Sequence, residues 1–336
     1  MNTKPATTEL LPERLVEHRA VQAWSQLQPE RVEPERIEIL KLRTKSAVYR
    51  LAGVGPDGSA VIAKKCYAST AAVERKIYQE LLPRLPLPAV RCLGLVNEPE
   101  GDYSWLFLQE AEGREYSLFR QADRALAGQW LGKLHGVASR AVLGSCLPGR
   151  EPSHYLHLLY SSRAAVLKLV DNPVVPEEDL PPLRAVAAWC DVIESHWGAL
   201  EDLCASQPRT VVHGDFVIKN VRVRSTAQSA ALFVFDWEMA GWGVPATDLA
   251  QFTGRSVSPD LGAYVSVMEA SGMRTDTRAA RRAAECGRFF RLIDDISWAC
   301  QWVVDDSYLF LKKPISCFRT YQERLAETLH VAGWAE

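Results

Sequence analysis

The stretch of residues 211–221 constrains this chain more than any other part of its sequence. A short apolar strand there leads directly into Asp215, and Asn220 follows five residues later. A second apolar run, residues 232–235, ends in Asp236. Both acidic residues therefore stand where a buried strand leaves the core, which is a common position for functional side chains held by a rigid scaffold.

This spacing suits phosphoryl transfer. That reaction needs a carboxylate to orient and deprotonate the incoming hydroxyl, and oxygen ligands for a magnesium ion that neutralises the phosphates. Asp215 fits the first role, whereas Asn220 and Asp236 fit the second. The interval between Asp215 and Asn220 equals that in the H-R-D-L-x-x-x-N loop of protein kinases. Asp215 alone could be a turn residue after a strand, so the prediction depends on the whole set, which includes Lys64.

The first part of the chain predicts an antiparallel sheet with one helix, and the rest is mostly helical. Apolar residues at roughly helical spacing predict a leading amphipathic helix over residues 8–28. Five strand-like runs follow, at residues 37–43, 47–52, 60–66, 90–96 and 105–109. Between the third and fourth runs, Ser69 or Thr70 can cap a helix that ends near Leu82. Long amphipathic stretches come later, near residues 123–138, 153–170, 182–204, 276–303 and 305–332. We therefore predict an α+β fold with an N-terminal domain at residues 1–110 and a C-terminal domain at residues 111–336.

Composition excludes several classes of protein. With 336 residues and 47% hydrophobic content, the chain can bury enough core for two lobes. The net charge of −2 lacks the basic footprint of nucleic-acid binders. The eight cysteines show no zinc-ligand spacing, and neither a signal peptide nor an 18-residue apolar run is present. We expect a cytoplasmic protein with reduced thiols, without nucleic-acid or membrane partners, that is a monomer or a weak dimer.

The combination of His213-Gly214-Asp215, Asn220 and Asp236-Trp237-Glu238 resembles the aminoglycoside phosphotransferase and choline kinase family. Residues 131–135 and 243–250 resemble the helix before that family's catalytic loop and the stretch after its metal-binding aspartate. The resemblance covers roughly residues 35–255. It implies a two-lobed protein-kinase-like fold and an ATP- and Mg²⁺-dependent transfer of a phosphoryl group to a small-molecule hydroxyl.

The resemblance also implies nucleotide-binding residues in the first half. The strand ending in Lys64 resembles V-A-I-K, whose lysine holds the α- and β-phosphates and pairs with a helix glutamate. For that glutamate we favour Glu74 over Glu80. Lys65 would point to the opposite face of the sheet, because strand side chains alternate. The connection that contains Gln109, Glu110 and Glu112 would present backbone groups to the adenine edge.

Some assignments near the phosphates stay open. The loop of residues 43–47 would cover the phosphates, but it has no glycine and would rely on Ser46 and backbone amides. The glycines of residues 53–58 imitate a nucleotide fingerprint, yet they lie too close to Lys64, and we interpret them as a hairpin turn. Lys219 could be a solvated surface charge or a phosphate contact. Glu238 could bind a second metal or make a structural hydrogen bond.

The acceptor site should involve residues after 255. Asp294, Asp295 and Trp298 stand at helical spacing and would suit a cationic or ring-bearing acceptor, such as an amine-bearing antibiotic or an amino alcohol. The alternative is a solvated helix face with the tryptophan in the core. The same motifs leave two alternative functions: a nucleotide-binding pseudokinase without turnover, and a protein kinase. The second is disfavoured because no A-P-E segment follows Asp236.

Overall fold

The chain forms two compact units in the computed structural model, which describes residues 8–9, 12–28, 33–43, 46–99, 101–138, 147–225, 229–303 and 307–334. One unit comprises Met1–Tyr116 and Asn220–Ala240, and the other comprises Ser117–Lys219 and Gly241–Glu336. Residues 220–240 thus group with the N-terminal part of the chain. A single boundary at residue 110 would instead assign them to the C-terminal domain. The division into lobes at that residue stays a prediction.

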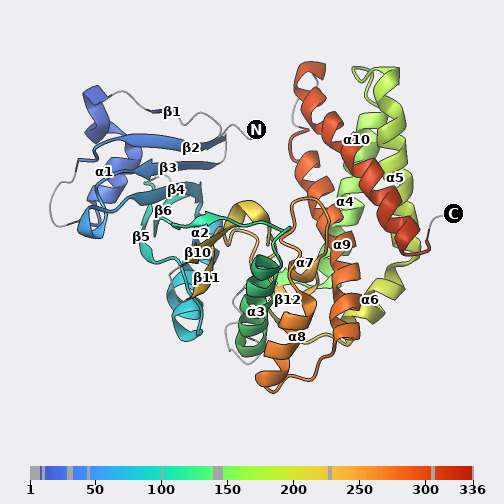
Figure 1. Ribbon diagram of the computed structural model, residues 1–336. Coiled ribbons are helices and arrows are strands. Elements are labelled where there is room, and N and C mark those ends of the chain that lie inside the picture. The colour runs from blue at the N-terminus through green and yellow to red at the C-terminus, as the bar shows by residue number, and fades with distance from the viewer. Residues whose placement is uncertain are drawn as a thin grey trace. The chain divides into compact units, whose positions relative to one another are not determined.

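The first unit is built on an antiparallel sheet with the strand order β1-β2-β3-β4-β6-β5. Its strands are β1 (Thr8–Glu9), β2 (Ile37–Arg43), β3 (Ser46–Leu51), β4 (Val61–Tyr67), β5 (Cys92–Asn97) and β6 (Tyr103–Gln109). Figure 1 shows them stacked in this order, from β1 to β5. The five predicted strands are confirmed, and the two-residue β1 adds an edge partner for β2. The glycine-containing stretch before β4 forms the turn from β3, as predicted.

One face of this sheet is apolar and packs against α1 (Arg19–Ser25). The ring of Trp24 lies 5.1 Å from that of Phe107, and its indole N–H donates to the Val54 carbonyl at 3.2 Å. The predicted leading helix is therefore present only in part, as a 3₁₀ turn over Pro12–Glu17 followed by α1. Residues 10–11, which belong to that prediction, lie outside the described residues.

The helix α2 (Ala68–Lys76) contacts β4, β5 and β6. It begins one residue before the predicted caps and has no side-chain cap, so the capping prediction was wrong. The helix then continues as a single π-helical turn, Ile77–Leu81, and ends in a 3₁₀ turn at Leu82–Arg84. π-helical turns are rare and occur frequently at functional sites.

A second, three-stranded sheet completes the first unit, with the order β11-β10-β7. Its strands are β7 (Arg114–Glu115), β10 (Val221–Ser225) and β11 (Ala230–Val234). Gly113, just before β7, has φ +136°, and a Cβ there would lie 2.7 Å from the Val223 carbonyl oxygen. Only glycine lets the chain pass so close to β10.

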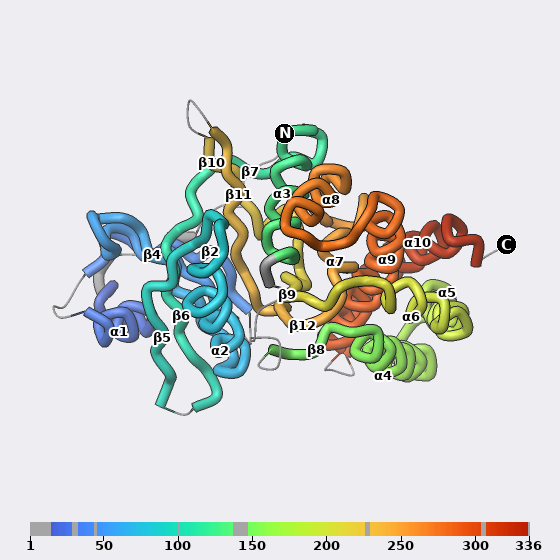
Figure 2. Tube along the Cα trace, turned by 90° about the horizontal axis from the view of Figure 1, so that it is seen from below, coloured from blue at the N-terminus to red at the C-terminus, as the bar shows by residue number. Residues whose placement is uncertain are grey.

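The second unit is mostly helical. Its helices are α3 (Gln121–Ala138), α4 (Pro152–Val170), α5 (Leu180–Ser195), α6 (Trp197–Ala205), α7 (Ala246–Leu249), α8 (Leu261–Ala270), α9 (Thr277–Cys300) and α10 (Tyr308–Val331). Figures 1 and 2 both show α4 and α5 running side by side, and the stacked rings of Tyr155 and Phe290, 4.1 Å apart, join α4 to α9. The stretch predicted as one helix over 182–204 is broken at His196 into α5 and α6. None of the helices in the described part of the chain combines the length and the apolar run that a transmembrane span requires.

A small sheet, β8 (Gly149–Arg150), β12 (Gly241–Gly243) and β9 (Thr210–Val212), lies within this helical unit. A Cβ on Gly243 would meet the Arg150 carbonyl oxygen at 2.0 Å, so a side chain there would separate β12 from β8. β9 is fully buried and leads directly into the segment that contains Asp215.

Candidate active site

Lys64 lies at the centre of a buried group of carboxylates in the first unit. It is 4% exposed, and its Nζ donates to Glu74 Oε1 at 2.6 Å and to Asp236, while Glu238 Oε2 lies 3.3 Å away. Burial disfavours the charged lysine, but the carboxylates of Glu74 and Asp236 outweigh it and raise the pKa of Lys64 well above its usual value. The ammonium is therefore charged at any physiological pH.

The neighbouring Lys65 points to the other face of the sheet, because side chains alternate along β4. Its Nζ pairs with Glu98 at 2.8 Å and lies 4.8 Å from the centroid of the Tyr103 ring. Of the two lysines, only Lys64 reaches the carboxylate group, which is the arrangement that the alternation predicted.

The β10–β11 hairpin holds Asn220 and Asp236 at the same end. Val221 and Val234 form the last pair of the ladder at this end. Just beyond this pair, the Phe235 N–H donates to the Asn220 carbonyl at 3.0 Å, so Asn220 and Asp236 both lie next to the end of the hairpin. Asn220 is buried, and Asp236 has φ +67°, a left-handed conformation that is unusual for a residue with a side chain. Such backbone conformations cluster at active sites.

The carboxylates around Lys64 fit a divalent cation. One ligand oxygen each from Glu74, Asp236 and Glu238 lie within 4.8 Å of one another. Three carboxyl groups face one ammonium, and burial raises the pKa of Glu74 to about 7 in spite of Lys64. In the part of the chain that the structure describes, Glu74 Oε2 is buried and accepts no hydrogen bond. Carboxylate oxygens are ligands that Mg²⁺ prefers. Of the two predicted metal ligands, Asp236 belongs to this cluster and Asn220 does not, and the metal site stays a prediction.

The predicted adenine connection leaves β6 and leads to β7. Gln109 ends β6, and the side chain of Glu110 accepts two hydrogen bonds from Arg50 Nε at 2.9 and 3.0 Å. Glu112 Oε2 lies 3.7 Å from Arg224, which is in β10. These side chains are used within the first unit, which agrees with a nucleotide role limited to their backbone groups.

Ser46 opens β3 and lines a cavity of about 500 Å³ together with Tyr49, Lys65 and Trp105. Lys65 marks this as the face of the sheet that does not carry Lys64. The phosphate-covering role of Ser46 stays a prediction, and its neighbours Thr44 and Lys45 lie outside the described residues.

In the second unit, the segment that carries Asp215 is anchored by Asp248. The carboxylate of Asp248 accepts hydrogen bonds from the His213 and Gly214 backbone N–H groups at 2.7 and 3.0 Å, and its Oδ2 lies 3.3 Å from His135 Nε2. Asp248 belongs to α7, which can approach α9 because Gly287 has no side chain: a Cβ there would lie 1.9 Å from the Ala246 carbonyl oxygen. Close packing of these two helices thus fixes the anchor of the segment that carries Asp215.

Asp215 is held between two cations. Arg291, from α9, donates from Nη1 and Nη2 to Asp215 Oδ1, both at 3.1 Å, and from Nη1 to the Gly214 carbonyl at 2.9 Å. Lys219 Nζ lies 3.3 Å from Oδ2. Burial opposes ionisation of the carboxyl, but Arg291, Lys219 and His213 outweigh it and lower the pKa of Asp215 to about 2. Asp215 is therefore an oriented carboxylate and a weak base.

The sequence did not single out Arg291 for this position. It lies 76 residues after Asp215 and is 8% exposed. The sequence signal for a buried charge at this position is that Arg291 lies between the apolar residues Phe290 and Leu292, because a buried arginine needs a partner. Nothing in the local pattern identified that partner as Asp215.

We expect the Arg291→Met variant to acquire an acid limb in its pH profile. The folded-state pKa of Asp215 is depressed to about 2, so protonation of Asp215 should not lower wild-type kcat/KM between pH 8 and pH 5. Without Arg291, burial is opposed only by Lys219 and His213, the pKa of Asp215 should rise, and turnover should fall by about 10-fold or more near pH 5. Arg291→Lys should restore part of the acid tolerance. Arg288→Met, on the same helix, is the control, and an unchanged profile for Arg291→Met would contradict the role of Arg291.

The predicted acceptor residues lie along α9 within two turns of Arg291. Asp294 is 6% exposed, and burial raises its pKa to about 7, partly offset by Arg291 and Arg150. Asp295 is half-buried and lies 3.8 Å from Arg324, whereas Trp298 is 39% exposed. The structure therefore leaves Asp295 and Trp298 accessible and encloses Asp294.

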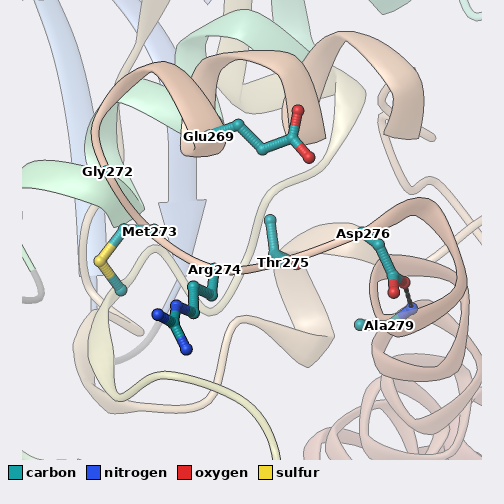
Figure 3. Close-up of a pocket in the computed structure, with 7 residues that line it drawn as sticks. All are labelled: Glu269, Gly272, Met273, Arg274, Thr275, Asp276 and Ala279. Carbon is teal, nitrogen blue, oxygen red and sulfur yellow. Dashed lines mark hydrogen bonds between the residues drawn. The ribbon is translucent and has the colours of Figure 1, made fainter.

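Another concavity, of about 630 Å³, lies at the connection between α8 and α9 (Figure 3). Glu269, Arg274 and Asp276 line it, and Asp276 caps α9 by accepting from the Ala279 N–H at 2.7 Å. It contains no residue that the sequence predicted as functional, so the candidate functional residues remain the group around Lys64 in the first unit and, separately, the group around Asp215 in the second.

The fold is shared with solved phosphotransferases and a kinase. A complex of the aminoglycoside phosphotransferase APH(2″)-IIIa with GDP and kanamycin is 12% identical, with a TM-score of 0.59, and covers 90% of this chain and 97% of its own. The macrolide 2′-phosphotransferase of Brachybacterium faecium is 14% identical, with a TM-score of 0.54 and coverage of 84% and 91%. Choline kinase of Cryptosporidium parvum Iowa II is 12% identical, with a TM-score of 0.56 and coverage of 94% and 95%. The sequence matches no curated protein.

The sequence profile described as "Phosphotransferase enzyme family" matches residues 53–286. This range runs from the turn before β4 to the middle of α9, and it includes Lys64, Asp215 and Asp236. The match covers well over half of the chain, which therefore belongs to the phosphotransferase enzyme family.

Proposed function

We propose that this protein transfers the γ-phosphoryl group of ATP to a hydroxyl of a small molecule and requires Mg²⁺. The observation that carries the proposal is the buried group of Lys64, Glu74, Asp236 and Glu238 in a member of the phosphotransferase enzyme family. A lysine fixed by carboxylates at hydrogen-bond distance is the arrangement that nucleotide-dependent phosphoryl transfer uses to bind phosphates and metal.

The first unit would supply the nucleotide side. Lys64, held by Glu74, would bind the α- and β-phosphates, and the connection of residues 109–112 would present its backbone to the base. Asn220 and Asp236 would hold the Mg²⁺, which when bound neutralises the charge of the phosphates. For Glu238, the short distance to Lys64 supports both a structural contact and a second metal-binding role.

The second unit would supply the acceptor side. Asp215 would accept a hydrogen bond from the acceptor hydroxyl and orient its oxygen for attack. The low pKa of Asp215 makes it a weak general base, so its main role would be to orient the hydroxyl. Orientation is sufficient because the transition state of phosphoryl transfer is loose and does not require a strong base. As the new P–O bond forms, the bond between the γ-phosphorus and the bridging oxygen breaks to release ADP, and the hydroxyl proton passes through the Asp215 carboxylate to solvent. Lys219 is charged and half-exposed beside Asp215, which supports a phosphate contact over a purely surface role.

For the acceptor we propose a molecule with a positive or ring-bearing group. Asp295 and Trp298 lie one and two turns along α9 from Arg291, which itself contacts Asp215, so they occupy the same helix face. A carboxylate and an exposed tryptophan ring suit an ammonium group or a stacked ring. Aminoglycosides and amino alcohols have both a hydroxyl and an amine.

A pseudokinase remains the main alternative, since the loop of residues 43–47 has no glycine. The complete set of Lys64, Asp215, Asn220 and Asp236 favours catalysis. A protein kinase is disfavoured because the residues from Asp236 to Asp248 contain only a tight turn, β12 and the start of α7. That stretch is fully described and leaves no room for an activation loop.

Incubation with γ-labelled ATP, and in parallel with labelled GTP, should yield a phosphorylated small molecule. The acceptor panel comprises aminoglycosides, amino alcohols, sugars, macrolides and nucleoside antibiotics, and the product is identified by an added phosphate in the mass spectrum. Reactions without acceptor or without Mg²⁺, and a generic protein acceptor, are the controls. Magnesium-dependent nucleotide binding without product from any acceptor would favour the pseudokinase.

A further inference from the structure

Tyr78 connects the π-helical turn after α2 to the hairpin that carries Asp236. The residue is 4% exposed, and its hydroxyl accepts a hydrogen bond from the Asp236 backbone N–H at 3.3 Å. The two residues are separated by 158 positions in the sequence but belong to the same unit. The sequence motifs indicate neither a metal-binding nor a nucleotide-binding role for Tyr78.

The hydrogen bond acts on the most unusual backbone in the site. Asp236 has φ +67°, and this conformation turns its side chain from the direction of β11 toward Lys64 and the carboxylate group. A residue with a Cβ does not adopt this conformation without support from its surroundings. The hydroxyl of Tyr78 provides such support, because it satisfies the N–H that the turn removes from the β10–β11 ladder.

Tyr78 lies in the π-helical turn that continues α2. Glu74 precedes Tyr78 by four residues, so a single stretch of helix delivers the carboxylate that fixes Lys64 and the hydroxyl that fixes Asp236. The change from α- to π-helical bonding occurs at Ile77, between these two residues. The irregular turn thus lies at the point where one helix supports two members of the site.

We infer that Tyr78 is a positioning residue for the divalent metal: its hydroxyl holds the Asp236 backbone so that the carboxylate is directed at the cation. The inference rests on the proposed metal-binding role of Asp236. Tyr78 itself contacts neither metal nor substrate. Removal of its hydroxyl should therefore weaken metal binding while leaving the fold and the acceptor affinity intact.

The test is a titration of the Tyr78→Phe variant with Mn²⁺ as a stand-in for Mg²⁺, in the presence of a non-hydrolysable ATP analogue, with free Mn²⁺ measured by electron paramagnetic resonance. The variant keeps the aromatic ring and is expected to fold, which thermal unfolding checks. Its Mn²⁺ affinity should fall by about 3- to 10-fold, the factor that one ordinary hydrogen bond supplies. The Mg²⁺ concentration for half-maximal turnover should rise by the same factor, with an unchanged KM for the acceptor.

Tyr308→Phe is the matched control, because it removes a tyrosine hydroxyl that donates to Asp179 at 2.7 Å in the other unit. Its metal affinity should equal that of the wild type. Equal affinity for Tyr78→Phe and the wild type would overturn the inference and leave the proposed function standing. If the wild type itself bound no Mn²⁺ with the nucleotide analogue, the proposed function would fail, and the inference with it.

Discussion

Replacement of Asp215 by alanine is expected to lower turnover by about 10²–10⁴-fold while nucleotide affinity stays close to that of the wild type. The reason lies in the division of the site. Asp215 belongs to the second unit, whereas Lys64, Glu74 and Asp236, which would bind the nucleotide and its metal, belong to the first. The variant therefore loses the group that orients the acceptor hydroxyl and keeps the phosphate-binding lysine.

The Asp215→Ala experiment needs a check on stability, because Arg291 would lose its buried partner. Removal of one member of a buried ion pair costs roughly 3–5 kcal/mol, and this could be mistaken for loss of catalysis. Turnover and nucleotide affinity should therefore be measured below the unfolding temperature of the variant. Asp191→Ala, which removes the half-exposed partner of Arg163, is the control. Activity of Asp215→Ala within 10-fold of the wild type would refute the assigned role.

Replacement of Lys64 by methionine is expected to reduce kcat/KM by about 10²–10³-fold, through loss of phosphate binding and of charge stabilisation in the transition state. The adjacent Lys65 gives an unusually close control. Lys65→Met removes the same charge one position along β4, but from the side of the sheet that carries Glu98 and Tyr103, and it should change kcat/KM by less than about threefold.

A double-mutant cycle separates catalysis from folding for Lys64. Lys64→Met leaves Glu74 buried without its partner, so it should destabilise the protein by roughly 3–5 kcal/mol. Lys64→Met combined with Glu74→Met should recover much of this stability, because an apolar pair replaces an unpaired charge. Activity should not recover with it. An active double variant, or equal losses for Lys64→Met and Lys65→Met, would show that Lys64 does not bind the phosphates.

Much of the fold follows from local patterns. The five antiparallel strands lie within two residues of the predicted ranges at both ends, because alternation and turn residues specify them. The pairing of Lys64 with Glu74 was implied by the resemblance to the family, whereas the opposite direction of Lys65 follows from the alternation of side chains along a strand. These features depend on residues that are near one another in the sequence or that repeat with a regular period.

The features that could not be predicted depend on tertiary contacts. The capture of Asp215 by Arg291 requires α9 to pack beside the catalytic loop, and that in turn requires the close approach of α7 at Gly287. The left-handed backbone of Asp236 occurs at a residue with a side chain, and its N–H donates to the hydroxyl of Tyr78, which is 158 positions away in the sequence. The break between α5 and α6 at His196 has no proline to mark it. The apolar periodicity runs through this residue, so it predicted one continuous helix.

The return of residues 220–240 to the first unit means that this protein cannot be divided by a single cut. A fragment ending at Tyr116 would contain Lys64 and Glu74 but not the hairpin that supplies Asn220 and Asp236, so it would have a phosphate-binding lysine with no metal ligand from that hairpin. The helices α8, α9 and α10 follow the last crossing of the chain at Gly241, but α9 also supplies the Arg291 that holds Asp215 and the Gly287 that lets α7 approach. A recombinant that takes these helices from a relative would therefore have to retain both residues to keep the Asp215 segment in place.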